Sequence, residues 1–440
     1  MSYVVSTKEE QAQMLKDIGL KNSDELFKDV PVSVLLKTPL EMPKGVSEFE
    51  VLRDIEKIAS KNRMFDSTFR GAGCYNHLIP EVVKHLSSLN GFVTSYTPYQ
   101  AEISQGSLQA IFEYQTEICD LFDMEVSNSS VYDGGSAAGE SMIMTLSKKT
   151  HRFLVAKSVN PNVKEVLKTY AFAEDIEIVE IASKNGLVDL EDLKEKITDD
   201  TAGFFVQSPN FYGLFENLKD IVKISHENKI QVVASVNPLT APLLKTPGSL
   251  GVDIVCGDGQ PLGLDRAFGG PYVGFLATCN KNVRKMPGRI VGQTVDEDGK
   301  RSFVLTLQAR EQHIRREKAS SSICSNQALA ALRCAMYMGA MGKTGLNEVA
   351  SQCMSKSHYA SSIINNMEGY NLMYDGEFFD EFVINTQYDI DEINRRLKKD
   401  NIEGPLKIGK NSMLVCITEA TTKDEIDKFI SILKEVSKWS

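Results

Sequence analysis

The 440-residue sequence contains no apolar run that approaches the ~20 residues needed to cross a bilayer. Its first residues, MSYVVSTKEEQAQMLKDIG, are acidic and helix-like, and they lack the apolar core of a signal peptide. These two absences predict a cytoplasmic protein with no membrane span.

Positive charge is also scarce, because 49 Lys and Arg residues stand against 59 Asp and Glu residues and the net charge is −10. No basic stripe is present to displace counterions from a phosphate backbone, which argues against nucleic acid as a partner. The eight cysteines include no CxxC pair, so neither a zinc ribbon nor a redox motif is expected, and no metal site is predicted. We expect these thiols to be small buried side chains in a reducing compartment.

The length exceeds what one hydrophobic core usually serves, so more than one domain is expected. Residues 1–66 are predicted to form an N-terminal helical arm, in which Asn22 and Glu25 fit a capping box. Val51, Ile55 and Ile58 mark a further amphipathic helix in this arm. Residues 67–330 are predicted to form a large α/β domain, and residues 331–440 a small C-terminal α/β domain.

Short β-branched runs alternate with helical segments through the large domain: RFLVA, IEIVEI, GFFVQS, KIQVVAS, VDIVC and PYVGFLA. This alternation predicts right-handed crossovers and a mostly parallel sheet with helices on both faces. The C-terminal region repeats the pattern once as FFDEFVINT, DIDEINRRLKK, KNSMLVCIT and DEIDKFISILKEVSKW, which predicts a β-α-β-α module.

Two groups that a sheet-based pyridoxal-phosphate enzyme requires are missing from this pattern. The strand and turn VDIVCGDGQPLG place Gln260 where such an enzyme has its Schiff-base lysine, and an amide cannot form an imine. Lys245 lies before that strand and Lys281 lies after the next one. The stretch QVVASVNPLT offers Asn237 in the region where an acid would hold the ring nitrogen protonated. We therefore predict that this chain does not bind the cofactor covalently.

A glycine turn, YDGGSAAGES, is predicted to connect a strand to a helix. Ser136, Ala137 and Glu140 follow the two glycines, and free N–H groups at such a helix start can bind a phosphate. The alternative is a tight turn with small residues for packing, and the local sequence leaves both open.

Polar and aromatic side chains also gather in a proline-containing loop before a helix: Tyr96, Thr97, Tyr99, Gln100, Glu102, Ser104 and Gln105. Such loops line pockets or subunit interfaces, and one site can do both. His77, in FRGAGCYNHLIPE, is expected to be a hydrogen-bonded structural histidine.

A basic run interrupts the acidic chain at Arg310, His313, Arg315, Arg316 and Lys318. This cluster could attract a carboxylate or an acidic partner. A solvated helix face with local ion pairs is the commoner explanation for such a run.

Five segments of the chain, in this order, resemble the glycine decarboxylase family, the P protein of the glycine cleavage system: FRGAGCYNHLIPEVV, TSYTPYQAEISQG, YDGGSAAGESM, CGDGQPLG with FGGPYVGF, and REQHIRREKASSSIC. The resemblance is to the first chain of the two-chain form and extends over nearly the whole sequence. It implies the fold of type I pyridoxal-phosphate enzymes and an α2β2 tetramer in which subunit 2 carries pyridoxal phosphate on its own lysine. It implies a subunit of glycine dehydrogenase (aminomethyl-transferring), with glycine as substrate and the lipoyl arm of H protein as acceptor.

By this resemblance the chain is a degenerate half with no catalytic residue of its own, and it is expected to be inactive alone. We expect the loop from Tyr96 to Gln105 and the segment from Arg70 to His77 to complete the funnel above the partner's cofactor. Two alternatives stay open at this stage. One is a stand-alone pyridoxal-phosphate lyase or transferase that uses a non-standard lysine, and the other is a non-enzymatic scaffold that binds a phosphate ligand.

Overall fold

The structure is a computed structural model that describes residues 5–38, 40–267 and 269–436. The chain divides between Met64 and Phe65 into two compact units. The first unit contains three short helical elements: α1 (Lys8–Asp17), η1 (Ser23–Phe27) and α2 (Glu48–Ala59). None of these three elements has a buried residue of its own.

Side-chain caps start each of these helices. Thr7 and Ser47 begin α1 and α2 with capping boxes. Asn22 accepts hydrogen bonds from the N–H groups of Asp24 and Glu25, but the helix it caps is a 3₁₀ turn. The predicted capping box would need the Glu25 carboxylate to accept a hydrogen bond from the N–H of Asn22. It is not formed, because that carboxylate accepts from the N–H of Lys21.

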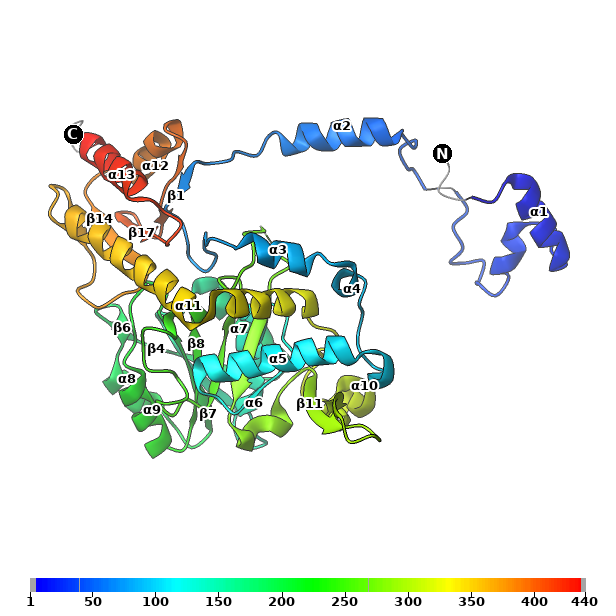
Figure 1. Ribbon diagram of the computed structural model, residues 1–440, viewed down its shortest axis with the longest axis horizontal. Helices are drawn as coiled ribbons and strands as arrows, with labels where there is room; N and C mark the ends of the chain where they lie inside the picture. Colours follow the sequence, from blue (N-terminus) through cyan, green and yellow to red (C-terminus); the bar gives the residue numbers. More distant parts are fainter. Residues whose placement is uncertain (1–4, 39, 268, 437–440) are drawn as a thin grey trace. The chain divides into compact units, whose positions relative to one another are not determined.

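The second unit is built on a seven-stranded sheet with the order β2-β10-β9-β8-β7-β3-β4 (Figure 1). Its strands are β2 (Val126–Ser127), β3 (Arg152–Ala156), β4 (Glu177–Ile181), β7 (Thr201–Ser208), β8 (Gln231–Val236), β9 (Ile254–Asp258) and β10 (Gly274–Thr278). Only β10 runs against its neighbours, so the predicted mostly parallel sheet is confirmed. Its central strands are almost wholly buried, as expected when helices cover both faces.

Helices pack against this sheet along most of its length. They are α5 (Gln105–Phe122), α6 (Gly134–Thr145), α7 (Pro161–Ala173), α8 (Leu190–Lys196) and α9 (Leu218–Glu227). The same unit also contains the shorter elements α3 (Glu81–Ser87), α4 (Asn90–Val93), η2 (Ala101–Ile103), η3 (Pro238–Thr240) and η4 (Asn280–Lys285). Helix α6 contacts β7 to β10, whereas α5 contacts β2 and β10. The strand predicted to run directly into Gly134 ends earlier, since β2 stops at Ser127 and Val131 makes a single bridge to Gly274.

Two hairpins and a basic segment complete the large region. The hairpins are β5 (Ser183–Lys184) with β6 (Leu187–Val188), and β11 (Ile290–Val295) with β12 (Arg301–Thr306). The basic segment forms η5 (Gln308–Arg310), α10 (Gln312–Arg315) and η6 (Arg316–Lys318). The run is therefore three short helical turns and not one continuous helix, and residues 312–318 are exposed, so the solvated alternative stays open.

Helix α11 (Ala328–Asn365) extends from the large sheet to a small antiparallel sheet and bends at Gly342, where φ is 58° and ψ is −176°. The small sheet has the order β13-β14-β17-β16. Its region contains β13 (Tyr370–Leu372), β14 (Glu381–Thr386), α12 (Ile390–Lys399), β15 (Ile402–Glu403), β16 (Leu406–Lys407), β17 (Ser412–Cys416) and α13 (Lys423–Val436). The predicted β-α-β-α module corresponds to β14, α12, β17 and α13.

A second hydrophobic core lies under the small sheet and includes Phe382, Ile384 and Phe429. Strand β1 (Ser67–Thr68) joins this region by pairing in parallel with β15. Residues 65–436 form one contact unit, so the division at residue 330 stays a prediction. Within the described part of the chain, no helix has the length and apolar character needed to cross a membrane.

Candidate functional site

A cavity of about 450 Å³ lies at the carboxyl ends of β8 and β9. Its wall is formed by the ends of β7, β8 and β9, the starts of α6, α7 and β14, and residues 72–75. In open parallel sheets, ligands bind beyond the carboxyl ends of the strands. This cavity is therefore the position where the fold would place a cofactor.

Gln260 is 2% exposed and lies in the turn after β9, between Asp258 and Pro261, which both line this cavity. Its amide oxygen accepts the N–H of Tyr75 at 2.9 Å, and its amide nitrogen donates to the carbonyls of Tyr75 at 2.8 Å and Leu264 at 2.9 Å. All three bonds use backbone groups, so Gln260 ties residues 70–77 to the turn after β9. The residue at the predicted lysine position is a structural clamp.

Two carboxylates occupy the start of α6, where a phosphate was considered. Asp258 accepts the N–H of Gly134 at 3.0 Å through one oxygen and the N–H of Gln260 at 2.8 Å through the other. Asp133 accepts the N–H of Ser136 at 2.7 Å. Burial raises the pKa of Asp258 to about 6, against the two N–H donors that lower it. The chain thus supplies its own anions to these donors.

The remaining residues of the glycine turn face the interior. The N–H of Ala137 makes the first helical bond, to the carbonyl of Asp133, and the Ala137 side chain is fully buried. Glu140 is 3% exposed and accepts hydrogen bonds from Ser321 and Tyr170. Burial nevertheless raises the pKa of Glu140 to about 7. The burial of Ala137 and Glu140 agrees with the alternative in which this turn serves packing and does not bind a phosphate.

Asn237 follows β8 and lines the cavity together with Ser235 and Val236. Its side-chain oxygen accepts the N–H of Leu239 at 3.0 Å, whereas its buried amide nitrogen has no partner. An amide donor cannot serve as the anionic counter-ion of a pyridinium nitrogen.

The two candidate lysines lie away from this cavity. Lys281 is paired with Asp253, which precedes β9, about 16 Å from Asp258 at ~3.3 Å per strand residue. Lys245 is exposed in the loop before β9. No lysine is among the described residues of the cavity wall.

A buried acid pair at the start of β14 was missed by the sequence analysis. Glu381 accepts the N–H of Ala72 at 2.6 Å and the hydroxyl of Tyr75 at 2.9 Å. Burial raises the pKa of Glu381 to about 7, and burial together with the charge of Glu381 raises that of Asp380 well above its usual value. The pair stands in the segment FFDEFVINT, where only the apolar strand pattern was used.

His77 lies in a second buried cluster, with Cys353 and Glu419. Its Nδ1 is 2.7 Å from Glu419, which also accepts the N–H of Leu78 and the thiol of Cys353. Burial opposes ionisation of Glu419, but the hydrogen bond and charge of His77 hold its pKa below the usual range. These contacts join residues 77–78 to α11 and to the turn after β17, which agrees with a hydrogen-bonded structural histidine.

The loop from Tyr96 to Gln105 is split between exposed and anchored residues. Tyr96 is 85% exposed, and Glu102 and Gln100 are exposed as well. Gln105 instead bonds both backbone groups of Phe303 in β12, and the hydroxyl of Tyr99 accepts a hydrogen bond from Arg289 at 3.0 Å. Ser104 is half-buried at the start of α5.

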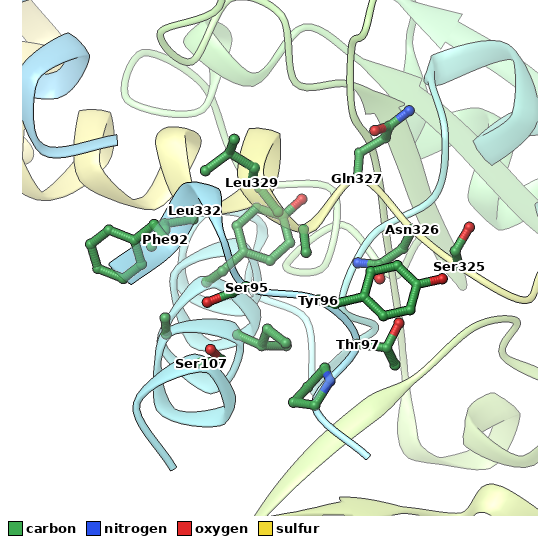
Figure 2. Close-up of a pocket in the computed structure, with 16 residues that line it drawn as sticks. Phe92, Ser95, Tyr96, Thr97, Ser107, Ser325, Asn326, Gln327, Leu329 and Leu332 are labelled. Atoms are coloured by element: carbon green, nitrogen blue, oxygen red, sulfur yellow. The ribbon is translucent and has the colours of Figure 1, made fainter. Parts of the chain in front are cut away.

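A smaller cavity of about 240 Å³ opens beside Tyr96 and Thr97 (Figure 2). Figure 2 shows a polar side formed by Tyr96, Thr97, Ser325 and Asn326, and an apolar side formed by Phe92, Leu329 and Leu332. The structure thus brings the start of this loop against the start of α11, whereas Gln105 and Tyr99 anchor the loop elsewhere.

The side chains of the basic run differ in burial, since one is turned inward and the others are exposed. Arg310 is turned inward, since its guanidinium donates to the carbonyls of Met286 and Gly288. His313 is exposed and lies 3.5 Å from Glu311. The side chains that remain as an exposed basic patch are Arg315, Arg316 and Lys318.

Comparison with known proteins connects this geometry to one family. Residues 1–433 match the sequence profile of the glycine cleavage system P-protein. The "probable glycine dehydrogenase (decarboxylating) subunit 1" of Bacillus licheniformis is 48% identical over 440 residues, which cover 98% of each chain. The protein of the same name from Listeria monocytogenes serotype 4b is 47% identical over 441 residues, with the same coverage.

Solved structures agree with these sequence matches. A crystal structure of glycine decarboxylase (P-protein) of the glycine cleavage system, in inhibitor-bound form, has a TM-score of 0.92 and 37% identity and covers 99% of this chain and 100% of its own. A glutamate decarboxylase from Lactobacillus brevis has a TM-score of 0.66 at 12% identity, with 95% and 98% coverage. Sphingosine-1-phosphate lyase from Burkholderia pseudomallei has a TM-score of 0.65 at 12% identity, with 93% and 95% coverage. The last two show the fold alone, that of type I pyridoxal-phosphate enzymes, and the predicted fold class is confirmed.

Proposed function

Because the chain belongs to the glycine cleavage system P-protein family, we propose that it is the subunit of glycine decarboxylase that binds no pyridoxal phosphate. In this proposal a homologous subunit 2 carries the cofactor in a cytoplasmic α2β2 assembly. The relatives' names, which specify a subunit 1, support a partner chain.

The chemistry of the cavity wall carries this proposal. Covalent binding of pyridoxal phosphate needs a lysine amine, an acid beneath the ring nitrogen and free donors for the phosphate. Gln260 and Asn237 stand in the first two regions, and Asp258 already holds the N–H of Gly134. The described residues of this cavity do not fit the cofactor.

The same contacts weigh against the two alternative functions. A stand-alone lyase would need Lys245 or Lys281 to reach the cavity, and Lys281 is held near the opposite end of β9. A phosphate-binding scaffold would need the N–H groups that Asp133 and Asp258 accept. Neither alternative has a contact in its favour.

The exposed residues of this chain fit a role in which it supports the active site of the partner subunit. Pyridoxal phosphate supplies an electron sink for the electrons left when carbon dioxide departs from glycine. We propose that the partner performs this step, and that the aminomethyl group passes to the lipoyl arm of the acidic H protein. The exposed side chains of the loop, Tyr96, Gln100 and Glu102, would contact the partner near its substrate funnel. Gln105, Tyr75 and His77 would hold the surrounding frame.

Reconstitution tests this division of labour. This chain and subunit 2 are purified separately, and release of carbon dioxide from carboxyl-labelled glycine is measured with lipoylated H protein for each chain and for the mixture. We expect turnover only in the mixture and borohydride-trapped cofactor only on subunit 2. Turnover by this chain alone, or a trapped cofactor on one of its lysines, would contradict the proposal.

A further inference from the structure

The cavity at the ends of β8 and β9 is strongly acidic. Asp133, Asp258, Asp380 and Glu381 contribute to its wall, and no lysine, arginine or histidine is among the described residues that line it. Three of these carboxylates already accept hydrogen bonds from the chain: Asp133, Asp258 and Glu381. The four acids therefore differ in whether their carboxylates already have hydrogen-bond donors.

Asp380 is the incomplete member of this set. It is 2% exposed, and its Oδ2 is buried without a hydrogen-bond partner. A buried acceptor without a partner is uncommon in native structures, because it loses its hydration and gains nothing in return. On the same cavity wall, the buried amide nitrogen of Asn237 is a donor without a partner. The cavity thus offers one free acceptor on an acid and one free donor.

We propose that this cavity binds a small primary organic ammonium ion that carries a hydrogen-bond acceptor and neither a phosphate nor a carboxylate. The ammonium group has three donors and a positive charge, which complement Asp380 and the neighbouring Glu381. The amide nitrogen of Asn237 donates to the acceptor of the ligand. Asp133 and Asp258 repel any anionic group at the start of α6.

The size of the cavity favours an organic cation over a bare metal ion. A volume of about 450 Å³ is within the range of small-molecule sites and exceeds that of a closed ion site. A cation would also relieve the cost of burying these acids, since burial raises the pKa of Glu381, and burial together with the charge of Glu381 raises that of Asp380. Glu419, on the turn after β17, is a further charged neighbour, and its negative charge also raises the pKa of Asp380.

This inference goes beyond the proposed function, because the ligand binds the degenerate cavity of this chain and needs no partner. It can fail while the division of labour between the two subunits stands, and the reverse also holds. A ligand held there would contact the ends of β8 and β9 and the start of β14, and so join the seven-stranded sheet to the four-stranded sheet.

Pyridoxamine is a suitable probe, because it has a primary amine and a ring-nitrogen acceptor but no aldehyde to react with surface lysines. Its binding to the full-length chain is measured by titration calorimetry, beside pyridoxamine 5′-phosphate and Ca²⁺. We expect saturable binding of pyridoxamine, and binding of the phosphorylated form that is weaker by about tenfold or more because of like-charge repulsion. Equal or tighter binding of the phosphorylated form would overturn the proposal, as would binding of Ca²⁺ without binding of pyridoxamine.

Variants identify the cavity as the site. D380N removes the free carboxylate with little change of shape, and we expect it to weaken pyridoxamine binding about tenfold. D298N removes an exposed acid on the β11–β12 turn and should bind like the unmodified chain. If D380N does not fold, N237S tests the donor, since serine keeps the cap on Leu239. Unchanged affinity in the folded D380N or N237S protein would overturn the proposal.

Discussion

The side-chain amide of Gln260 pairs with both backbone groups of Tyr75, accepting its N–H and donating to its carbonyl. A third bond joins the same amide to the carbonyl of Leu264. Gln260, which stands at the position predicted for a Schiff-base lysine, thus holds Tyr75 against the turn after β9.

We expect Q260A to lower the free energy of unfolding by about 2–4 kcal/mol, because three buried backbone groups lose their partner. Denaturant unfolding monitored by circular dichroism measures this loss. Q308A, at an exposed glutamine of η5, should change stability by less than about 0.5 kcal/mol. Equal stability of the two variants would show that the clamp contributes nothing.

The strands and helices of this fold could be predicted because each one carries its own pattern. The runs RFLVA, GFFVQS and KIQVVAS are buried on both faces, and unbroken β-branched runs indicate such strands. Gln260 and Asn237 could be placed at strand ends from the sequence, whereas their correspondence to the lysine and the acid of a cofactor enzyme stays a prediction.

The partners of these residues could not be predicted, because they depend on contacts between distant segments. Asp258 lies within GDG, which reads as a turn, and its bond to Gly134 spans 124 residues. Asp380 and Glu381 stand at the start of an apolar strand, where acids usually face solvent. Arg310 and Arg315 belong to the same basic run, yet Arg310 is turned inward whereas Arg315 is exposed.

Removal of the two carboxylates at the start of α6 should create an anion site. We expect phosphate to stabilise the double variant D133S/D258S by about 1 kcal/mol at concentrations a few times Kd, because the N–H of Gly134 becomes free. The single variant D133S should show no such effect, since Asp258 still holds that N–H. The measurement is the midpoint of thermal unfolding in phosphate buffer, compared with the midpoint in a chloride buffer of equal ionic strength that contains neither phosphate nor sulfate. Phosphate stabilisation of the unmodified chain would contradict this account.

Glu140 should make stability depend on pH. Its pKa is raised by burial from 4.5 to about 7 in the folded chain, so its contribution is fully present below about pH 4.5 and is lost as pH rises through about 7. E140Q lacks this titration, and its stability relative to the unmodified chain should increase by up to ~3 kcal/mol between about pH 5 and about pH 8. Denaturant unfolding across this range measures the difference. E165Q, at an exposed glutamate, should show no such trend, and a flat E140Q difference would exclude an elevated pKa.

Variants of Tyr96 and Tyr99 should distinguish a residue that contacts the partner from a residue that supports the fold. Tyr99 accepts a hydrogen bond from Arg289, so Y99F should lose about 1 kcal/mol of stability. Tyr96 is 85% exposed, so Y96F should leave the stability of the isolated chain unchanged. Y96F should still reduce glycine turnover in the reconstituted assembly, because the hydroxyl is proposed to contact the partner's funnel. Unchanged turnover with intact assembly would remove Tyr96 from that role.

The exposed basic patch of Arg315, Arg316 and Lys318 is a candidate surface for the acidic H protein of the proposed function. If it binds there, replacing all three residues by glutamine should weaken H-protein affinity by about tenfold at low salt, because exposed charges steer and hold an oppositely charged partner. The difference from the unmodified assembly should shrink as salt increases, since exposed charges are screened over about 8 Å at physiological ionic strength. R310Q is the matched control, because Arg310 donates to backbone carbonyls and should affect stability more than affinity. Affinity that is insensitive to both salt and the triple replacement would place H protein on another surface, and the patch would then be an ordinary solvated segment.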